Sequence, residues 1–82
     1  MTKLFKFEKQ GCVPCQAVQN YLDEQGVEVI KINPFDNPEM AARYNIGSVP
    51  TLILFDDDGK EIGRSIGFNP PEIDGLIEKL SL

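Results

Sequence analysis

The chain has 82 residues, of which 41% are hydrophobic and 26% charged, so it is long enough for one globular domain over residues 1–82. Its formal net charge of −5, with scattered basic residues, argues against nucleic acid as a partner. No apolar run approaches the length needed to span a membrane, and we expect no membrane partner. The first residues lack the apolar core and cleavage site of a signal peptide, so we expect a cytoplasmic protein.

The first half of the chain predicts a strand, a helix and a second strand. Residues 3–7 are mostly apolar and predict a short strand buried on both faces. A helix over residues 14–25 follows, with Gly26 as its left-handed cap and an apolar stripe formed by Val18, Tyr21 and Leu22. Residues 27–32 predict the second strand. This order implies a right-handed crossover between two parallel strands.

A short helix interrupts the strands after a break at residues 33–36. Asn37 is its predicted N-cap, Pro38 takes its first position, and the helix over residues 38–44 ends near Asn45, which tolerates the left-handed conformation.

The last part of the chain predicts a hairpin and a helix. Residues 52–55 form an apolar strand, an aspartate-rich turn ends at Gly59, and residues 60–66 return antiparallel. Asn69 and Glu72 predict a capping box for the final helix, whose apolar face is Ile73, Leu76, Ile77 and Leu80. The resulting β-α-β-(α)-β-β-α order predicts an α/β fold, a four-stranded mixed sheet with helices on both faces.

The two cysteines, Cys12 and Cys15, lie three residues apart between the first strand and the first helix. Cys12 is expected at the helix N-terminus, where unpaired N–H groups and the helix dipole favour a thiolate. Cys15 lies about one turn further in, with its sulfur directed inward. Pro14 suits the first turn because its missing N–H has no partner to lose there. We therefore predict Cys12 as the nucleophile and Cys15 as the resolving thiol.

Two alternatives to redox chemistry are open for the cysteine pair. A zinc site needs four ligands, and with no histidine only a dimer that shares two pairs would supply them. A structural disulfide would close a loop too small to constrain the unfolded chain much. We predict no bound metal and no cofactor, because two sulfurs carry both electrons.

The element order, the Cys12-Val13-Pro14-Cys15 motif and the segment Gly47-Ser48-Val49-Pro50-Thr51 resemble the thioredoxin and glutaredoxin superfamily, in a minimal form of the thioredoxin fold. The resemblance implies that Pro50 is cis and packs beside the disulfide, and that the backbone of Val49 pairs with substrate. We predict an apolar docking rim of Val13, Ile46, Val49 and Phe68. The predicted substrate-binding residues are Val13, Pro14, Val49, Pro50 and Phe68.

The chain departs from that family at two positions near the cysteines. Gly11 stands where thioredoxins carry a tryptophan, and Lys6 stands where they carry a buried acid. Lys31 matches the family's partner lysine. We predict that these lysines, with Lys9, modulate the pKa of the Cys12 thiol and that Lys6 and Lys31 lower it.

The resemblance implies a thiol–disulfide oxidoreductase that reduces protein disulfides, is regenerated by an upstream reductase such as thioredoxin reductase, and acts as a monomer. Gly67-Phe68-Asn69-Pro70 is similar to a segment of small redoxins that supply electrons to ribonucleotide reductase. Two rivals are open. Lys9 matches a basic residue of glutathione-dependent glutaredoxins, and a non-catalytic module could bind a metal or an iron–sulfur cluster through Cys12.

Overall fold

The computed structural model describes residues 2–80 and confirms the predicted order of elements. None of the helices within this range is long and apolar enough to cross a membrane. The elements are β1 (Lys3–Phe7), α1 (Val13–Glu24), β2 (Ile30–Ile32), α2 (Pro38–Arg43), β3 (Thr51–Phe55), β4 (Glu61–Ile66) and α3 (Pro70–Leu80).

The four strands form one mixed sheet in the order β2-β1-β3-β4. The parallel pair β1 and β2 arises from the crossover through α1, while β3 runs antiparallel to both β1 and β4. All five residues of β3 are buried, as expected for a central strand with both faces covered. The predicted mixed sheet is confirmed.

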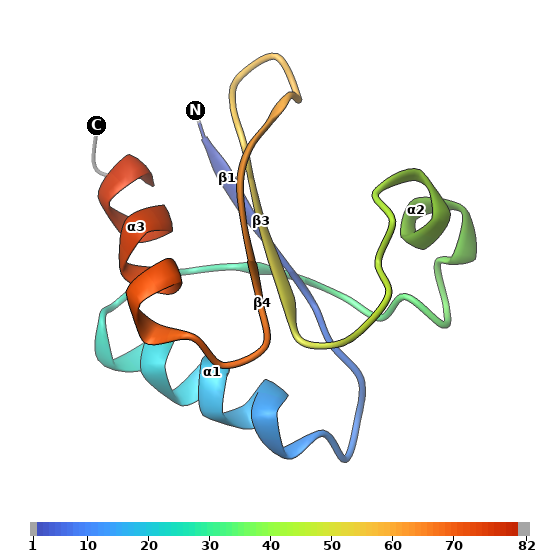
Figure 1. Cartoon of the computed structure of the whole chain (residues 1–82), viewed down its shortest axis with the longest axis horizontal. Helices are drawn as coiled ribbons and strands as arrows, with labels where there is room; N and C mark the ends of the chain where they lie inside the picture. Colours follow the sequence, from blue (N-terminus) through green and yellow to red (C-terminus); the bar gives the residue numbers. More distant parts are fainter. Residues whose placement is uncertain (1, 81–82) are drawn as a thin grey trace.

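Helices cover both faces of the sheet, and the alternation of side chains along each strand separates two apolar clusters. Figure 1 shows α1 and α3 on one side of the strands and α2 on the other. The larger cluster, against α1 and α3, is built from Leu4, Val18, Leu22, Leu52, Leu54, Ile73 and Leu76. The smaller cluster, on the α2 side, is built from Phe7, Ile53 and Phe55.

Helix α1 begins and ends where its local sequence predicts, one residue earlier at each end. Cys12 is the N-cap, and Gly26 follows the helix with φ +69°. The N–H of Val27 donates to the carbonyl oxygen of Leu22 at 3.0 Å, and the N–H of Gly26 to that of Asp23 at 3.1 Å. These two bonds satisfy carbonyls that the end of a helix otherwise leaves unpaired.

The second strand is shorter than predicted, because only Ile30–Ile32 of residues 27–32 pair with β1. Val27 is held by the end of α1, and the side chains of Val27 and Val29 pack against the larger cluster instead. Alternating apolar residues therefore mark a packed connection here rather than a strand.

The predicted caps of the other two helices differ in outcome. Asn37 occupies the N-cap position of α2, but its side chain makes no cap bond and donates to the carbonyl oxygen of Asn33 at 3.0 Å. Asn69 caps α3 as predicted, because its Oδ1 accepts from the N–H of Glu72 at 3.3 Å. The Glu72 carboxylate accepts from the Ser65 hydroxyl at 3.4 Å, so only the Asn69 half of the predicted capping box is formed.

A hydrogen bond joins α1 and α3, the two helices that pack against the larger cluster. The Tyr21 hydroxyl on α1 donates to Oδ1 of Asp74 on α3 at 2.5 Å. This bond, with smaller contributions from desolvation and from the nearby negative charges, raises the pKa of Tyr21 above its usual 10.0. The neutral phenol therefore persists to higher pH in the folded chain.

Candidate active site

The two cysteines form a disulfide at the N-terminus of α1, with their Cα atoms 5.2 Å apart. Cys12 is half-buried, whereas Cys15 is only 3% exposed. The N–H of Cys15 donates to Sγ of Cys12 at 3.2 Å, so the sulfur acts as the capping acceptor of the helix. A helix N-terminus and a donated N–H both favour negative charge on Cys12, while burial disfavours it on Cys15.

The segment that precedes β3 carries a cis peptide bond between Val49 and Pro50, which confirms that prediction. Pro50 is fully buried, and its carbonyl oxygen accepts from the N–H of Gly67 at 2.9 Å. The Thr51 hydroxyl donates to the carbonyl oxygen of Ser48 at 2.8 Å and closes the turn. These bonds fix the backbone of Val49, which lines a cavity together with Cys12.

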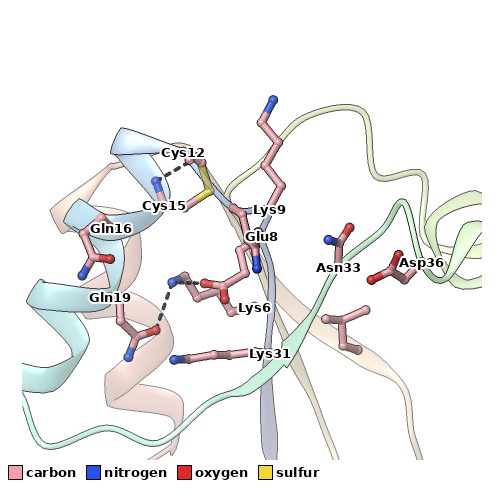
Figure 2. A pocket seen from close by; sticks show the side chains of 13 residues that line it. Lys6, Glu8, Lys9, Cys12, Cys15, Gln16, Gln19, Lys31, Asn33 and Asp36 are labelled. Carbon is pink, nitrogen blue, oxygen red and sulfur yellow. Dashed lines mark hydrogen bonds and ion pairs between the residues drawn. A yellow bond between two sulfur atoms is a disulfide. The ribbon is translucent and has the colours of Figure 1, made fainter.

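A polar cavity of about 480 Å³ lies on the inner side of the disulfide, between α1 and the parallel strands (Figure 2). Lys6 forms part of its wall although its side chain is only 1% exposed. The Lys6 ammonium forms an ion pair with Glu8 and donates to Oε1 of Gln19 at 2.9 Å. A buried cation is costly unless it is paired in this way. The cavity is lined by Lys6, Glu8, Lys9, Gln10, Gly11, Cys12, Cys15, Gln16, Gln19, Lys31, Ile32, Asn33 and Asp36.

The three predicted lysines line the same polar cavity as the two cysteines, but their exposure differs. Lys6 is buried, and Lys31 lies beside it in the register of β1 and β2 but is exposed. Lys9 is also exposed, and Figure 2 shows its side chain directed outward, away from Lys6.

A second cavity, of about 740 Å³ and largely apolar, lies on the other side of Cys12. Its lining includes three of the four predicted rim residues, Val13, Ile46 and Val49, together with Pro14 and Phe35. The fourth predicted rim residue, Phe68, lines neither cavity and instead packs against Tyr21, with ring centroids 6.2 Å apart.

Comparison with known proteins assigns the chain to a family. The family model of the thioredoxin-like domain matches residues 2–81, essentially the whole chain. The protein belongs to the thioredoxin-like family.

Relatives of this thioredoxin-like chain are similar along most of its length. The thioredoxin-like protein YosR, derived from the SPbeta prophage of Bacillus subtilis, is 40% identical over 78 residues, which are 95% of this chain and 98% of that protein. The thioredoxin of Staphylococcus epidermidis is 34% identical over 76 residues, 85% of this chain and 72% of its own length.

Solved thioredoxin structures share the fold. Thioredoxin NaTrxh from Nicotiana alata superposes with a TM-score of 0.82 at 23% identity, covering 95% of this chain and 71% of its own. Oxidised mitochondrial thioredoxin 3 from Saccharomyces cerevisiae gives 0.81 at 28% identity, covering 95% and 77%. With its Cys12–Cys15 pair and these relatives, the thioredoxin-like chain is a protein disulfide oxidoreductase.

Three residues of the thioredoxin-like site were missing from the sequence prediction. Glu8 lies two residues after Lys6, the spacing that places side chains on one face of an extended segment. Gln19 lies four residues after Cys15, on the same face of a helix. Both spacings were readable from the sequence. Phe35 lies in a turn, and only the fold shows that this turn borders the cavity at Cys12.

Proposed function

We propose that this oxidoreductase reduces protein disulfides with Cys12 as the nucleophile. The Cys12 thiolate attacks one substrate sulfur, a mixed disulfide forms, and the other substrate sulfur leaves as a thiolate. Cys15 then attacks Cys12, which releases the second substrate thiol and forms the Cys12–Cys15 disulfide. Two electrons pass from the cysteine pair to the substrate, and the departing thiolates take up the two protons that the pair gives up.

The observation that carries this proposal is the asymmetry of the two sulfurs. Cys12 is half-exposed, caps α1 and accepts the N–H of Cys15, whereas Cys15 is 3% exposed beneath it. The first sulfur is thus accessible and its thiolate favoured, and the second is placed to act only on a bond already formed at Cys12.

Substrate would be held beside the cis peptide bond. The backbone of Val49 lines the apolar cavity and is presented for pairing with an extended substrate segment, as in strand addition. Val13, 81% exposed between the cysteines, offers an apolar contact at the point of attack.

The similarity to bacterial thioredoxins supports thioredoxin reductase, rather than glutathione, as the source of electrons. We place the protein as a monomer in the cytoplasm. Ribonucleotide reductase is a candidate substrate, supported by the Gly67-Phe68-Asn69-Pro70 segment that precedes and opens α3.

The test is reduction of insulin disulfides by the wild type, Cys12→Ser and Cys15→Ser, with either thioredoxin reductase and NADPH or glutathione and its reductase. We expect at least a ~1,000-fold loss in Cys12→Ser, and a trapped mixed disulfide in Cys15→Ser but not in Cys12→Ser. Activity retained by Cys12→Ser would refute the proposal. Full activity of Cys15→Ser with glutathione alone would favour the glutaredoxin reading. Metal analysis of protein purified without air tests the binding-module reading.

A further inference from the structure

Cys12 stands at the boundary between two hollows of opposite chemical character. The polar cavity and the apolar cavity share three lining residues, Lys9, Gly11 and Cys12. A disulfide that reaches Cys12 therefore has cations on one side and apolar side chains on the other.

Gly11 leaves the boundary between the two hollows free of a side chain at its position. It adopts φ +69°, a backbone conformation that residues with a side chain rarely adopt. A Cβ added there would meet no atom within 4 Å. Gly11 therefore presents only backbone to both hollows, so an extended segment beside the Cys12 sulfur meets no side chain at this position.

The polar cavity carries positive charge that its own residues do not neutralise. Glu8 pairs with Lys6, but within residues 2–80 neither Lys9 nor Lys31 has an ion-pair partner. The remaining carboxylate on the cavity wall, Asp36, lies beside Asn33, apart from the cysteines in Figure 2. Three lysines against two carboxylates leave this wall with a net charge of +1, in a chain whose net charge is −5.

The apolar hollow is shaped by an aromatic side chain on a rigid turn. Phe35 is 72% exposed, and its N–H donates to Oδ1 of Asn33 at 2.8 Å. A second bond, from the N–H of Asp36 to the carbonyl oxygen of Asn33 at 3.1 Å, fixes the same turn. Because the backbone of this turn is already fixed, covering the Phe35 ring costs less conformational entropy than covering a ring on an unconstrained loop.

We propose that the substrate is a polypeptide disulfide with an acidic residue on one side of the attacked cysteine and an apolar residue on the other. This inference rests on the proposed function and names its substrate class. The carboxylate lies toward Lys31 and Lys9, and the apolar side chain contacts Phe35, Ile46 and Val49. Oxidised glutathione shares the carboxylates but has no apolar side chain for the second hollow, so a polypeptide fits better.

The test uses peptides that carry leucine on one side of a cysteine and glutamate, glutamine or lysine on the other, in both orders, each as its disulfide dimer. For the residue order that reacts faster, we expect the reduced protein to reduce the glutamate peptide about five-fold faster than its glutamine counterpart. The lysine peptide should be the slowest. The preference should shrink toward one in 0.5 M salt, because the charges are at the surface.

Two charge-matched variants separate recognition from reactivity. Lys31→Gln should lower the glutamate-to-glutamine rate ratio to about two, whereas Lys60→Gln, an exposed lysine outside both cavities, should leave the ratio at its wild-type value. Each peptide has the same intrinsic reactivity toward every variant, so a change in the ratio reports recognition.

Equal rates for all three peptides, or equal ratios in both variants, would overturn the charge inference while leaving disulfide reduction intact. Oxidised glutathione reduced faster than the glutamate peptide would also overturn it. If no peptide is reduced, or if Cys12→Ser reduces them as well as the wild type, the proposed function itself fails.

Discussion

At the scale of single residues, the unusual feature is a buried lysine in the wall of the polar cavity that the disulfide also lines. Lys6 is 1% exposed and is held by the Glu8 carboxylate and the Gln19 amide. We predict that its charge favours a thiolate at Cys12, whereas a buried carboxylate would oppose one. Because Glu8 forms an ion pair with Lys6, we predict that it partly cancels this effect.

Replacing Lys6 by methionine keeps most of the side-chain volume and removes the charge. We expect Lys6→Met to raise the pKa of the Cys12 thiol and to slow its alkylation at pH 7 about three- to ten-fold, because the thiolate fraction falls. The measurement is thiolate absorbance at 240 nm against pH in the reduced protein, with iodoacetamide rates alongside.

Lys3→Met on the same strand serves as the control, because Lys3 is exposed and lines neither cavity. Glu8→Gln should move the thiol pKa in the opposite direction, since it leaves the Lys6 charge unneutralised. A titration curve that stays in place in both Lys6→Met and Glu8→Gln would show that the pair does not act on Cys12.

At the scale of elements, local rules predicted what depends on a few neighbouring residues. The cap at Cys12, the left-handed Gly26 and the cap at Asn69 all follow from backbone groups within a helical turn. The errors arose where a distant partner decides the outcome. Residues 27–29 satisfy a strand pattern, but their side chains pack on the cluster beneath α1 and α3 instead of extending β2.

One glycine on β4 and one within α3 should respond to alanine with opposite signs. A Cβ on Gly63 would lie 2.5 Å from Cδ2 of the buried Leu76, so we expect Gly63→Ala to lower the free energy of unfolding by about 1–2 kcal/mol. Gly75 lies within α3 with no atom within 4 Å of an added Cβ. Gly75→Ala should therefore raise the free energy of unfolding by about 0.5–1 kcal/mol.

Urea denaturation of both variants measures these changes, and each serves as the control for the other. A stabilised Gly63→Ala would mean that the Leu76 side chain moves aside at little cost. In that case the close approach of α3 to β4 does not depend on the missing side chain at position 63.

At the scale of the whole molecule, the fold and the reactive cysteine pair could be predicted from the sequence, but the two cavities beside the pair could not. The Cys12–Cys15 spacing and the cis Pro50 segment are short motifs. The polar cavity instead lies among the loop after β1, α1, β2 and the turn before α2, and the apolar cavity is completed by the segment before β3. Which loop residues share a wall depends on the packed sheet, and no local spacing encodes it.

The two faces of the sheet are covered unequally. Helices α1 and α3 bury five side chains between them, Cys15, Val18, Leu22, Ile73 and Leu76, whereas α2 buries none. We therefore expect local opening to begin at α2. Hydrogen–deuterium exchange followed by mass spectrometry should show peptides from residues 38–46 exchanging at least ~10-fold faster than those from β3. Equal protection would indicate that the fold opens only as a whole.

The bond from the Cys15 N–H to Sγ of Cys12 has a practical consequence. The chain has no tryptophan, so its oxidation state has no indole fluorescence to report it. That one backbone proton, however, faces a neutral sulfur in the disulfide and a charged one in the thiolate, and a charge-assisted bond is shorter and stronger. Its NMR resonance should therefore move downfield on reduction and follow the ionisation of Cys12, which makes it a label already built into the backbone.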